Sequence, residues 1–69
     1  VIVCDGSNHR IQRWRPNATT GETIAGSPNG IAGSTAGLLN APRGIAIDRS
    51  DNVYVVDTLN LRIQKFTVL

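Results

Sequence analysis

The sequence predicts an all-β fold in which short antiparallel strands follow one another as a meander. The first observation behind this prediction is a segment of fourteen residues that occurs twice. The second is that each copy holds two short stretches with β-branched and aromatic residues, separated by turn residues, a pattern typical of strands. The third is that no part of the chain shows a convincing helical pattern.

The two copies are residues 1–14, VIVCDGSNHRIQRW, and residues 53–66, VYVVDTLNLRIQKF. Seven of the fourteen positions are identical, and two further positions keep a basic and an aromatic residue. Unrelated segments of this length would share about one residue at average residue frequencies. The offset of 52 residues lies in the range that marks proteins built from repeated structural units.

Six strands are expected in order, at residues 1–4, 10–14, 20–25, 44–48, 53–56 and 62–66. Within each copy, four residues (6–9 or 58–61) join the two strands and suit a hairpin loop. The segment from Gly26 to Leu39 holds four glycines and one proline, so we expect a long loop there. Because the strands have apolar residues at consecutive positions, we expect both faces of each small sheet to be covered by further sheets.

Composition excludes several classes of protein. The chain has 69 residues and a net charge of +2, and its 17% of charged residues lies below the average of about 25%. It therefore has no block of like charge typical of a nucleic-acid-binding arm, and its apolar runs are too short for membrane insertion in this segment. One cysteine cannot form an internal disulfide, and no Cys/His set has metal-ligand spacing.

Residues 42–66 carry a pattern that resembles the NHL repeat, which reads roughly P-x-G-I-A-V-D, a short turn, and N-I-Y-V-A-D-T-x-N-x-R-I-Q-x-F. Here the segment is PRGIAIDRSDNVYVVDTLNLRIQKF. Residues 1–14 are a second, partial match. The first copy departs from the family's Asn-His-Leu at Arg10 and the second departs at Leu61, but both keep the frame Asp-x-x-Asn-x-Arg-Ile-Gln.

The resemblance implies a β-propeller with four strands and about 40 to 50 residues per blade. On that template, residues 1–26 are the last three strands of one blade, residues 27–41 are a long inter-blade loop, and residues 42–69 are the first three strands of the next. Propellers have about four to eight blades. We therefore expect further blades, either from the same longer chain or from self-association.

One set of polar residues recurs in both hairpins and is interpreted as a structural hydrogen-bond network. A carboxylate at the end of one strand could act as a general base, but recurrence in both copies favours a role in holding the hairpin. The set consists of Asp5, Asn8 and Arg10 in the first copy and Asp57, Asn60 and Arg62 in the second. No catalytic, cofactor-binding or metal-binding residue is predicted.

Four other features each have a possible functional interpretation and a simpler structural one. His9, the single histidine, has no partner cluster for metal or base chemistry, and Cys4 aligns with Val56 as a small apolar residue. The glycine-rich loop lacks the ending of a phosphate-binding loop. A cluster of Arg10, Arg13, Arg15 and Trp14 could stack bases, but strand alternation places Arg13 on the opposite face, which favours packing between blades.

The meander also predicts which loops lie together, because successive turns alternate between the two ends of a sheet. Loops 6–9, 58–61 and 27–41 should share one end, and the turns at 15–19 and 49–52 the other. Candidate binding residues at the first end are Ser7, His9, Asn29, Ile31, Leu59 and Leu61. Asn17-Ala18-Thr19, at the second end, is an N-glycosylation sequon that slightly favours an extracellular location.

The function expected from these observations is a non-catalytic scaffold that binds a protein or another ligand through its loops. One alternative is an RNA-binding propeller, as in some NHL proteins. A third is an enzyme similar to the peptidyl-amidoglycolate lyases, in which several histidines hold a metal, although only His9 is present here. The resemblance does not choose a compartment or a particular ligand.

Overall fold

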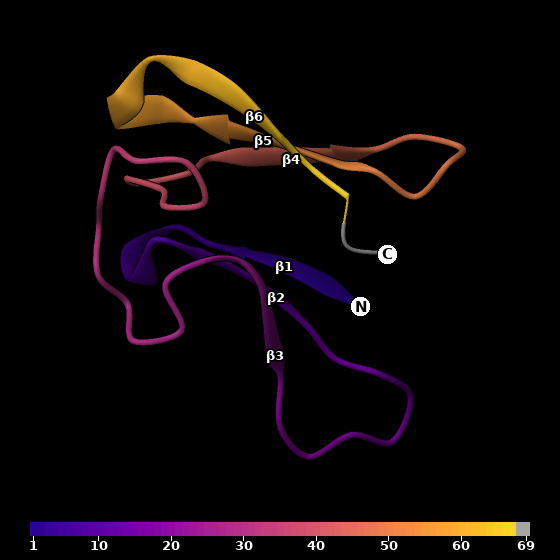
Figure 1. Ribbon diagram of the computed structural model, residues 1–69. Helices are drawn as coiled ribbons and strands as arrows, with labels where there is room; N and C mark the ends of the chain where they lie inside the picture. Colours follow the sequence, from indigo (N-terminus) through magenta and orange to yellow (C-terminus); the bar gives the residue numbers. More distant parts are fainter. Residues whose placement is uncertain (68–69) are drawn as a thin grey trace.

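The computed structural model describes residues 1–67 and contains two three-stranded antiparallel sheets (Figure 1). The first sheet has the order β1–β2–β3 and the second the order β4–β5–β6, so every strand pairs with its neighbour in sequence. The strands are β1 (Ile2–Asp5), β2 (Arg10–Arg13), β3 (Glu22–Gly26), β4 (Gly44–Ile47), β5 (Val53–Asp57) and β6 (Arg62–Phe66). The all-β meander is confirmed, and each strand begins and ends within two residues of its expected bounds. Residues 68–69, the end of the second expected blade segment, lie outside the described residues.

Each hairpin loop contains a regular turn in place of an irregular four-residue connection. A single 3-10 turn, η1 (Gly6–Asn8) or η2 (Thr58–Asn60), follows the aspartate and ends at a residue with left-handed backbone, His9 (φ 54) or Leu61 (φ 52). Their backbone N–H groups donate back to the carbonyls of Gly6 and Thr58 at 3.3 and 3.1 Å. The sequence repeat is therefore also a repeat of local backbone geometry.

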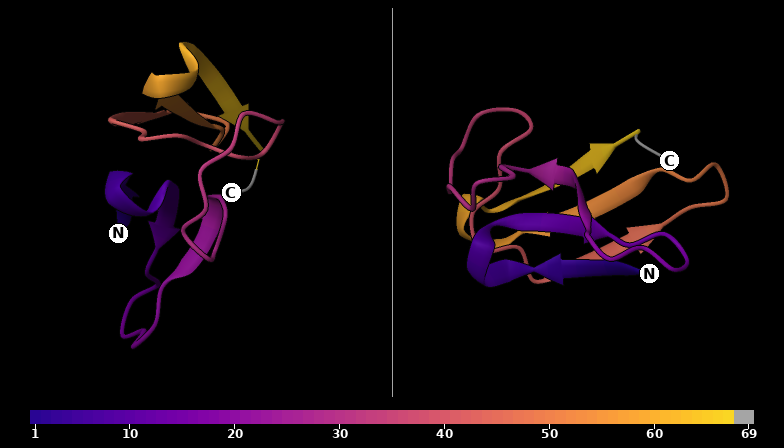
Figure 2. Two further views of the ribbon diagram at one scale, coloured as in Figure 1. Left: turned by 90° about the vertical axis from the view of Figure 1, so that its left-hand side faces the viewer. Right: turned by 90° about the horizontal axis from the view of Figure 1, so that it is seen from below.

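The core lies between the two sheets, which stack as separate layers joined at one end (Figure 2). In β5, Val53, Val55 and Asp57 alternate with less buried residues and are 0% exposed, because they face the first sheet. The buried apolar residues are Ile11, Ala25, Leu39, Val53 and Val55. The opposite face of β5 carries Val56, which is 43% exposed, so among the described residues this strand is fully buried on one face only.

Residues 27–43, here called the linker, contain no strand and run along one end of both sheets (Figure 1). The linker leaves β3 at Gly26, whose φ of +83 and close approach to the His9 carbonyl require glycine, since a Cβ there would overlap that oxygen. The Gly26 N–H donates to the carbonyl of Gly37, further along the linker, at 3.1 Å. No helix in the described part of the chain is long and apolar enough to span a membrane.

Candidate functional site

The Asp57 carboxylate is the centre of a buried hydrogen-bond network at the end of β5. Its Oδ1 accepts from the backbone N–H of Asn40 at 2.7 Å, and its Oδ2 accepts from Asn60 Nδ2 at 3.0 Å, Arg62 Nε at 2.8 Å and Gln64 Nε2 at 3.3 Å. Burial acts to raise the pKa of Asp57, but these four donors outweigh it and the pKa lies below its ordinary value. A carboxylate that accepts four hydrogen bonds stabilises the local structure and is a poor proton acceptor.

The same network fixes the linker to the second sheet. The Arg62 guanidinium donates to the carbonyls of Ser34, Thr35 and Leu38 at 2.8 to 3.0 Å. Gln64 Nε2 donates to the same Leu38 carbonyl at 2.7 Å, and Asn60 Nδ2 to the carbonyl of Gly33 at 2.8 Å. Gln64 was not among the residues selected from the sequence, although its identity with Gln12 was the available signal.

The equivalent network at Asp5 is smaller and more exposed. Its carboxylate accepts from Asn8 Nδ2 at 3.1 and 3.2 Å and from Arg10 Nε at 3.0 Å, and these bonds, that of Arg10 first, lower its pKa. Arg10 Nη1 also donates to the carbonyl of Pro28 at 2.9 Å. The Thr23 hydroxyl donates to Gln12 Oε1. Side-chain exposure is 26% for Asp5 against 0% for Asp57. The difference arises because the linker donates and accepts several hydrogen bonds at the second network and accepts one, at the Pro28 carbonyl, from the first.

Loops 6–9 and 58–61 and the linker lie at one end of the molecule, here called the hairpin end, and the loops at 14–21 and 48–52 extend at the other (Figure 1). The six candidate binding residues are all on segments of the hairpin end. Leu61, Leu59 and Ile31 are 93%, 63% and 61% exposed. Ser7 and Asn29 are also exposed, whereas His9 is half-buried.

An open cleft of about 640 Å³ lies at the hairpin end, where η1 meets the linker. Its lining is Cys4, Gly6, Ser7, His9, Ala41, Pro42 and Arg43. His9 Nδ1 accepts from the Ala41 N–H at 3.0 Å, which places the proton of the neutral ring on Nε2 as a donor. The sequence did not single out Arg43, because the linker reaches η1 only through the stacking of the two sheets.

Cys4 lies in the wall of this cleft, and its thiol is partly buried. Its Sγ donates to the carbonyl of Pro42 at 3.3 Å. Burial, and secondly the nearby Asp5 charge, raise the pKa of the Cys4 thiol. Little thiolate would form near neutral pH, which agrees with the interpretation of Cys4 as an apolar filling residue.

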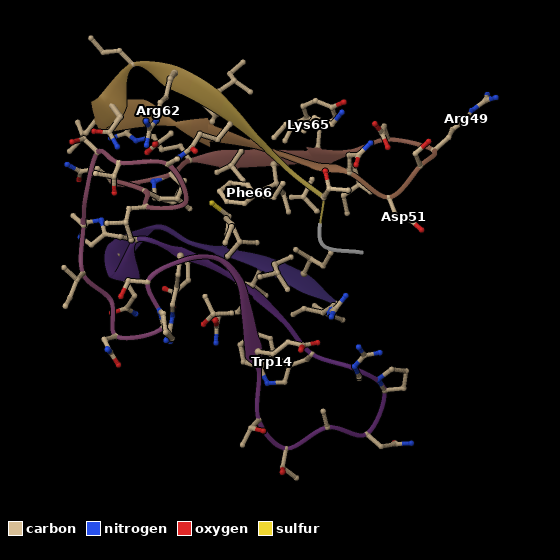
Figure 3. All side chains as sticks on the ribbon, viewed as in Figure 1. Trp14, Arg49, Asp51, Arg62, Lys65 and Phe66 are labelled. Carbon is tan, nitrogen blue, oxygen red and sulfur yellow. The ribbon has the colours of Figure 1, made fainter. Side chains whose placement is uncertain are left out.

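The basic cluster around Trp14 is largely neutralised by carboxylates. Arg13 Nη2 lies 2.6 Å from Glu22 Oε1, and Arg15 Nε lies 3.5 Å from the same oxygen. Trp14 lies against Gly21 on the side of the first sheet away from the second (Figure 3). Within residues 1–67, no group of three or more His, Cys, Asp or Glu side chains is arranged to hold a metal ion.

Comparison with known proteins gives one match. The NHL repeat family matches residues 39–66, which include the linker end, all of β4, β5 and β6, and the Asp57 network. No curated protein and no solved structure matches the chain at a significant level. The resemblance seen in the sequence is therefore confirmed over residues 39–66, which match the NHL repeat, and the two antiparallel three-stranded sheets are consistent with parts of NHL β-propeller blades.

Proposed function

We propose that the chain is a non-catalytic binding scaffold that presents its hairpin end to a protein ligand. The observation that carries this proposal is the open cleft at the hairpin end together with the exposed aliphatic side chains of the same end. The Leu59 N–H donates to the carbonyl of Asn40 at 3.1 Å, so η2 lies directly beside the linker segment that continues into the wall of the cleft.

The apolar part of the surface supports a protein as the ligand. Leu61 and Leu59 project from η2, and the left-handed backbone at Leu61 leaves its side chain 93% exposed. Removing such side chains from water on contact with a partner is favourable, and contiguous exposed apolar residues often mark protein interfaces.

The polar part of the surface supports a ligand rich in hydrogen-bond acceptors. Ser7, His9 and Arg43 line the cleft and supply a hydroxyl, an Nε2–H and a guanidinium. Arg43 has no ion-pair partner among residues 1–67. A peptide segment that combines a carboxylate with aliphatic side chains would match both parts of the surface.

RNA receives less support from these contacts. Arg10 and Arg13 are paired with Asp5 and Glu22, and Arg15 lies near the same glutamate. A surface that binds phosphates needs cations whose charge is available. The first copy therefore offers RNA no cationic patch comparable to the cleft and its aliphatic rim.

A peptide-binding experiment tests the proposal. The chain is immobilised, used to select binders from a random peptide library displayed on phage, and the selected peptides are measured against three variants. Arg43→Ala and Leu61→Asn should each weaken binding about tenfold, which corresponds to about 1.4 kcal/mol. Asn tolerates the left-handed backbone, so Leu61→Asn removes the apolar group and keeps the turn.

Arg49→Ala is the matched control, because Arg49 is exposed at the opposite end (Figure 3). It should leave peptide binding unchanged. Selection of no peptides, or equal losses for Arg43→Ala and Arg49→Ala, would contradict the proposal.

A further inference from the structure

Residues 40–43 of the linker carry the chain past the cleft, and the last three of them line it. The first and last residues of this stretch are held by the second sheet. The Asn40 N–H donates to Asp57 Oδ1 at 2.7 Å. The Arg43 N–H donates to the carbonyl of Val56 at 3.2 Å. Both ends of the stretch are therefore fixed to the second sheet.

The two middle residues are held by the first sheet instead. The Ala41 N–H donates to His9 Nδ1 at 3.0 Å. The carbonyl of Pro42 accepts from Cys4 Sγ at 3.3 Å. The turn η1 packs directly against this carbonyl, since a Cβ on Gly6 would lie 2.7 Å from the Pro42 oxygen. This stretch therefore joins the two sheets at the cleft, and a histidine makes one of the contacts.

The backbone of Ala41 needs support from its surroundings. Its φ of +50 lies in the left-handed region, where a Cβ comes too close to the following carbonyl. A residue that precedes a proline, as Ala41 does, also prefers an extended conformation. Such a backbone persists only where neighbouring contacts impose it. The bond to His9 is the contact that reaches the Ala41 N–H from the first sheet, so its loss would allow Ala41 to become extended.

The bond between His9 and Ala41 exists in one charge state of the ring. A neutral imidazole has one nitrogen that accepts and one that donates, whereas both nitrogens of an imidazolium donate. Protonation of Nδ1 would therefore set two N–H donors against each other. It would also add a positive charge to the cleft that Arg43 lines. Because His9 itself lines this open cleft, protons from the solvent can reach its ring.

The neighbouring charged and titratable groups keep their charge between about pH 5 and about pH 8, where histidines titrate. The bonds that Asp5 accepts, that of Arg10 first, hold its pKa below the ordinary value, so it stays ionised. Burial raises the pKa of the Cys4 thiol, so it stays neutral. The guanidinium groups of Arg10 and Arg43 stay protonated. His9 is therefore the group of the cleft whose charge changes in this range.

We infer that His9 is a pH-sensitive switch: its neutral ring holds Ala41 and Pro42 against the first sheet, and its protonation releases them and opens the wall of the cleft. The change is confined to these two residues, because both ends of the stretch stay on the second sheet. Leu61 occupies the equivalent position in the other hairpin, and its side chain accepts no hydrogen bond. The inference concerns the chain without a ligand, so it does not depend on the proposed function.

Nuclear magnetic resonance of the 15N-labelled chain between about pH 8 and about pH 5 tests the inference. The carbon-bound ring protons give the midpoint of the His9 titration. Hydrogen exchange gives the protection of each amide, corrected for the intrinsic effect of pH on exchange. Protection of the Ala41 amide should fall about tenfold with the same midpoint, as expected for the loss of one hydrogen bond. The amides of Asn40 and Arg43 should keep their protection, which distinguishes release of the wall from acid unfolding.

His9→Asn is the matched variant. Asparagine tolerates the left-handed backbone, and its side-chain carbonyl can accept from the Ala41 N–H, but it does not titrate. Protection of the Ala41 amide should therefore be independent of pH in this variant. A parallel fall in both chains would overturn the inference.

The unmodified chain provides a test that needs no variant. If protection of the Ala41 amide stays constant while the His9 ring titrates, or falls together with that of Asn40 and Arg43, the inference is wrong. This measurement decides the matter even if His9→Asn does not fold.

Discussion

Asp5 and Asp57 are the same residue in two copies of one repeat, and they differ in what surrounds them. Asp57 is fully buried and receives four hydrogen bonds, including one from the linker backbone at Asn40. Among residues 1–67, the side-chain donors to the Asp5 carboxylate are Asn8 and Arg10 of its own hairpin. An identical residue therefore has a different energetic importance in each copy.

The first prediction compares these two carboxylates. Asp57→Asn should destabilise the chain by about 2 kcal/mol, because it leaves the partly buried Arg62 guanidinium without its charged partner. Asp5→Asn should cost less than about 1 kcal/mol, since the Asp5–Arg10 pair is partly exposed and screened by water. Urea denaturation of both variants measures the free energies of unfolding. Equal losses would show that the linker contact at Asp57 contributes nothing.

At the scale of elements, the sequence predicted strands well and loop geometry poorly. The strands follow from β-branched stretches and from the repeat, which both depend on local sequence. The 3-10 turns and the left-handed residues His9 and Leu61 were missed, since neither glycine nor asparagine marks those positions. The cleft residue Arg43 was missed because its neighbours come from a sheet distant in sequence.

The turn between β4 and β5 provides a prediction for this scale. The Asp48 carboxylate accepts from the backbone N–H groups of Ser50 and Asn52 at 2.8 and 3.0 Å. It also accepts from Asn52 Nδ2 and the Tyr54 hydroxyl, each at 3.0 Å. These bonds, that of the Asn52 side chain first, lower the pKa of Asp48 to about 2, and the same contact raises the pKa of Tyr54.

A carboxyl group whose pKa is lower in the folded chain stabilises the fold above its unfolded pKa of 3.8 and loses that contribution as the pH falls through about 2. Asp48→Asn should therefore reduce the loss of stability on acidification. Urea midpoints of both proteins between about pH 5 and about pH 2 measure this effect. Parallel pH profiles for the two proteins would contradict the prediction.

At the scale of the whole molecule, the linker connects the two sheets through side chains of the second. Three of the linker carbonyls accept hydrogen bonds from Arg62, whereas one, that of Pro28, accepts from Arg10 of the first sheet. The residues expected to form a long loop contain no strand, but the attachment of the linker to the second sheet could not be predicted. The bonds from Arg62 join residues separated by 24 to 28 positions, and no local sequence pattern predicts such contacts.

The linker can be tested by limited proteolysis. Arg62→Ala removes the donors to Ser34, Thr35 and Leu38, so residues 33–38 should open more often and be cleaved about tenfold faster by a protease of broad specificity. Arg10→Ala removes a single bond to the linker and should change cleavage at 33–38 little. Mass spectrometry of the fragments locates the cuts. Cleavage confined to residues 14–21 in both variants would contradict the anchoring role of Arg62.

The pairing of each strand with its neighbour in sequence has a consequence for how the chain folds. All four strand pairs close over short or moderate connections, so their contacts cost little loop-closure entropy. The contacts between the sheets, such as Ile11 with Val53 and Val55 in one core, join residues more than forty positions apart. Such a topology favours two sheets that form independently and early, followed by a slower search in which the linker docks and the layers meet.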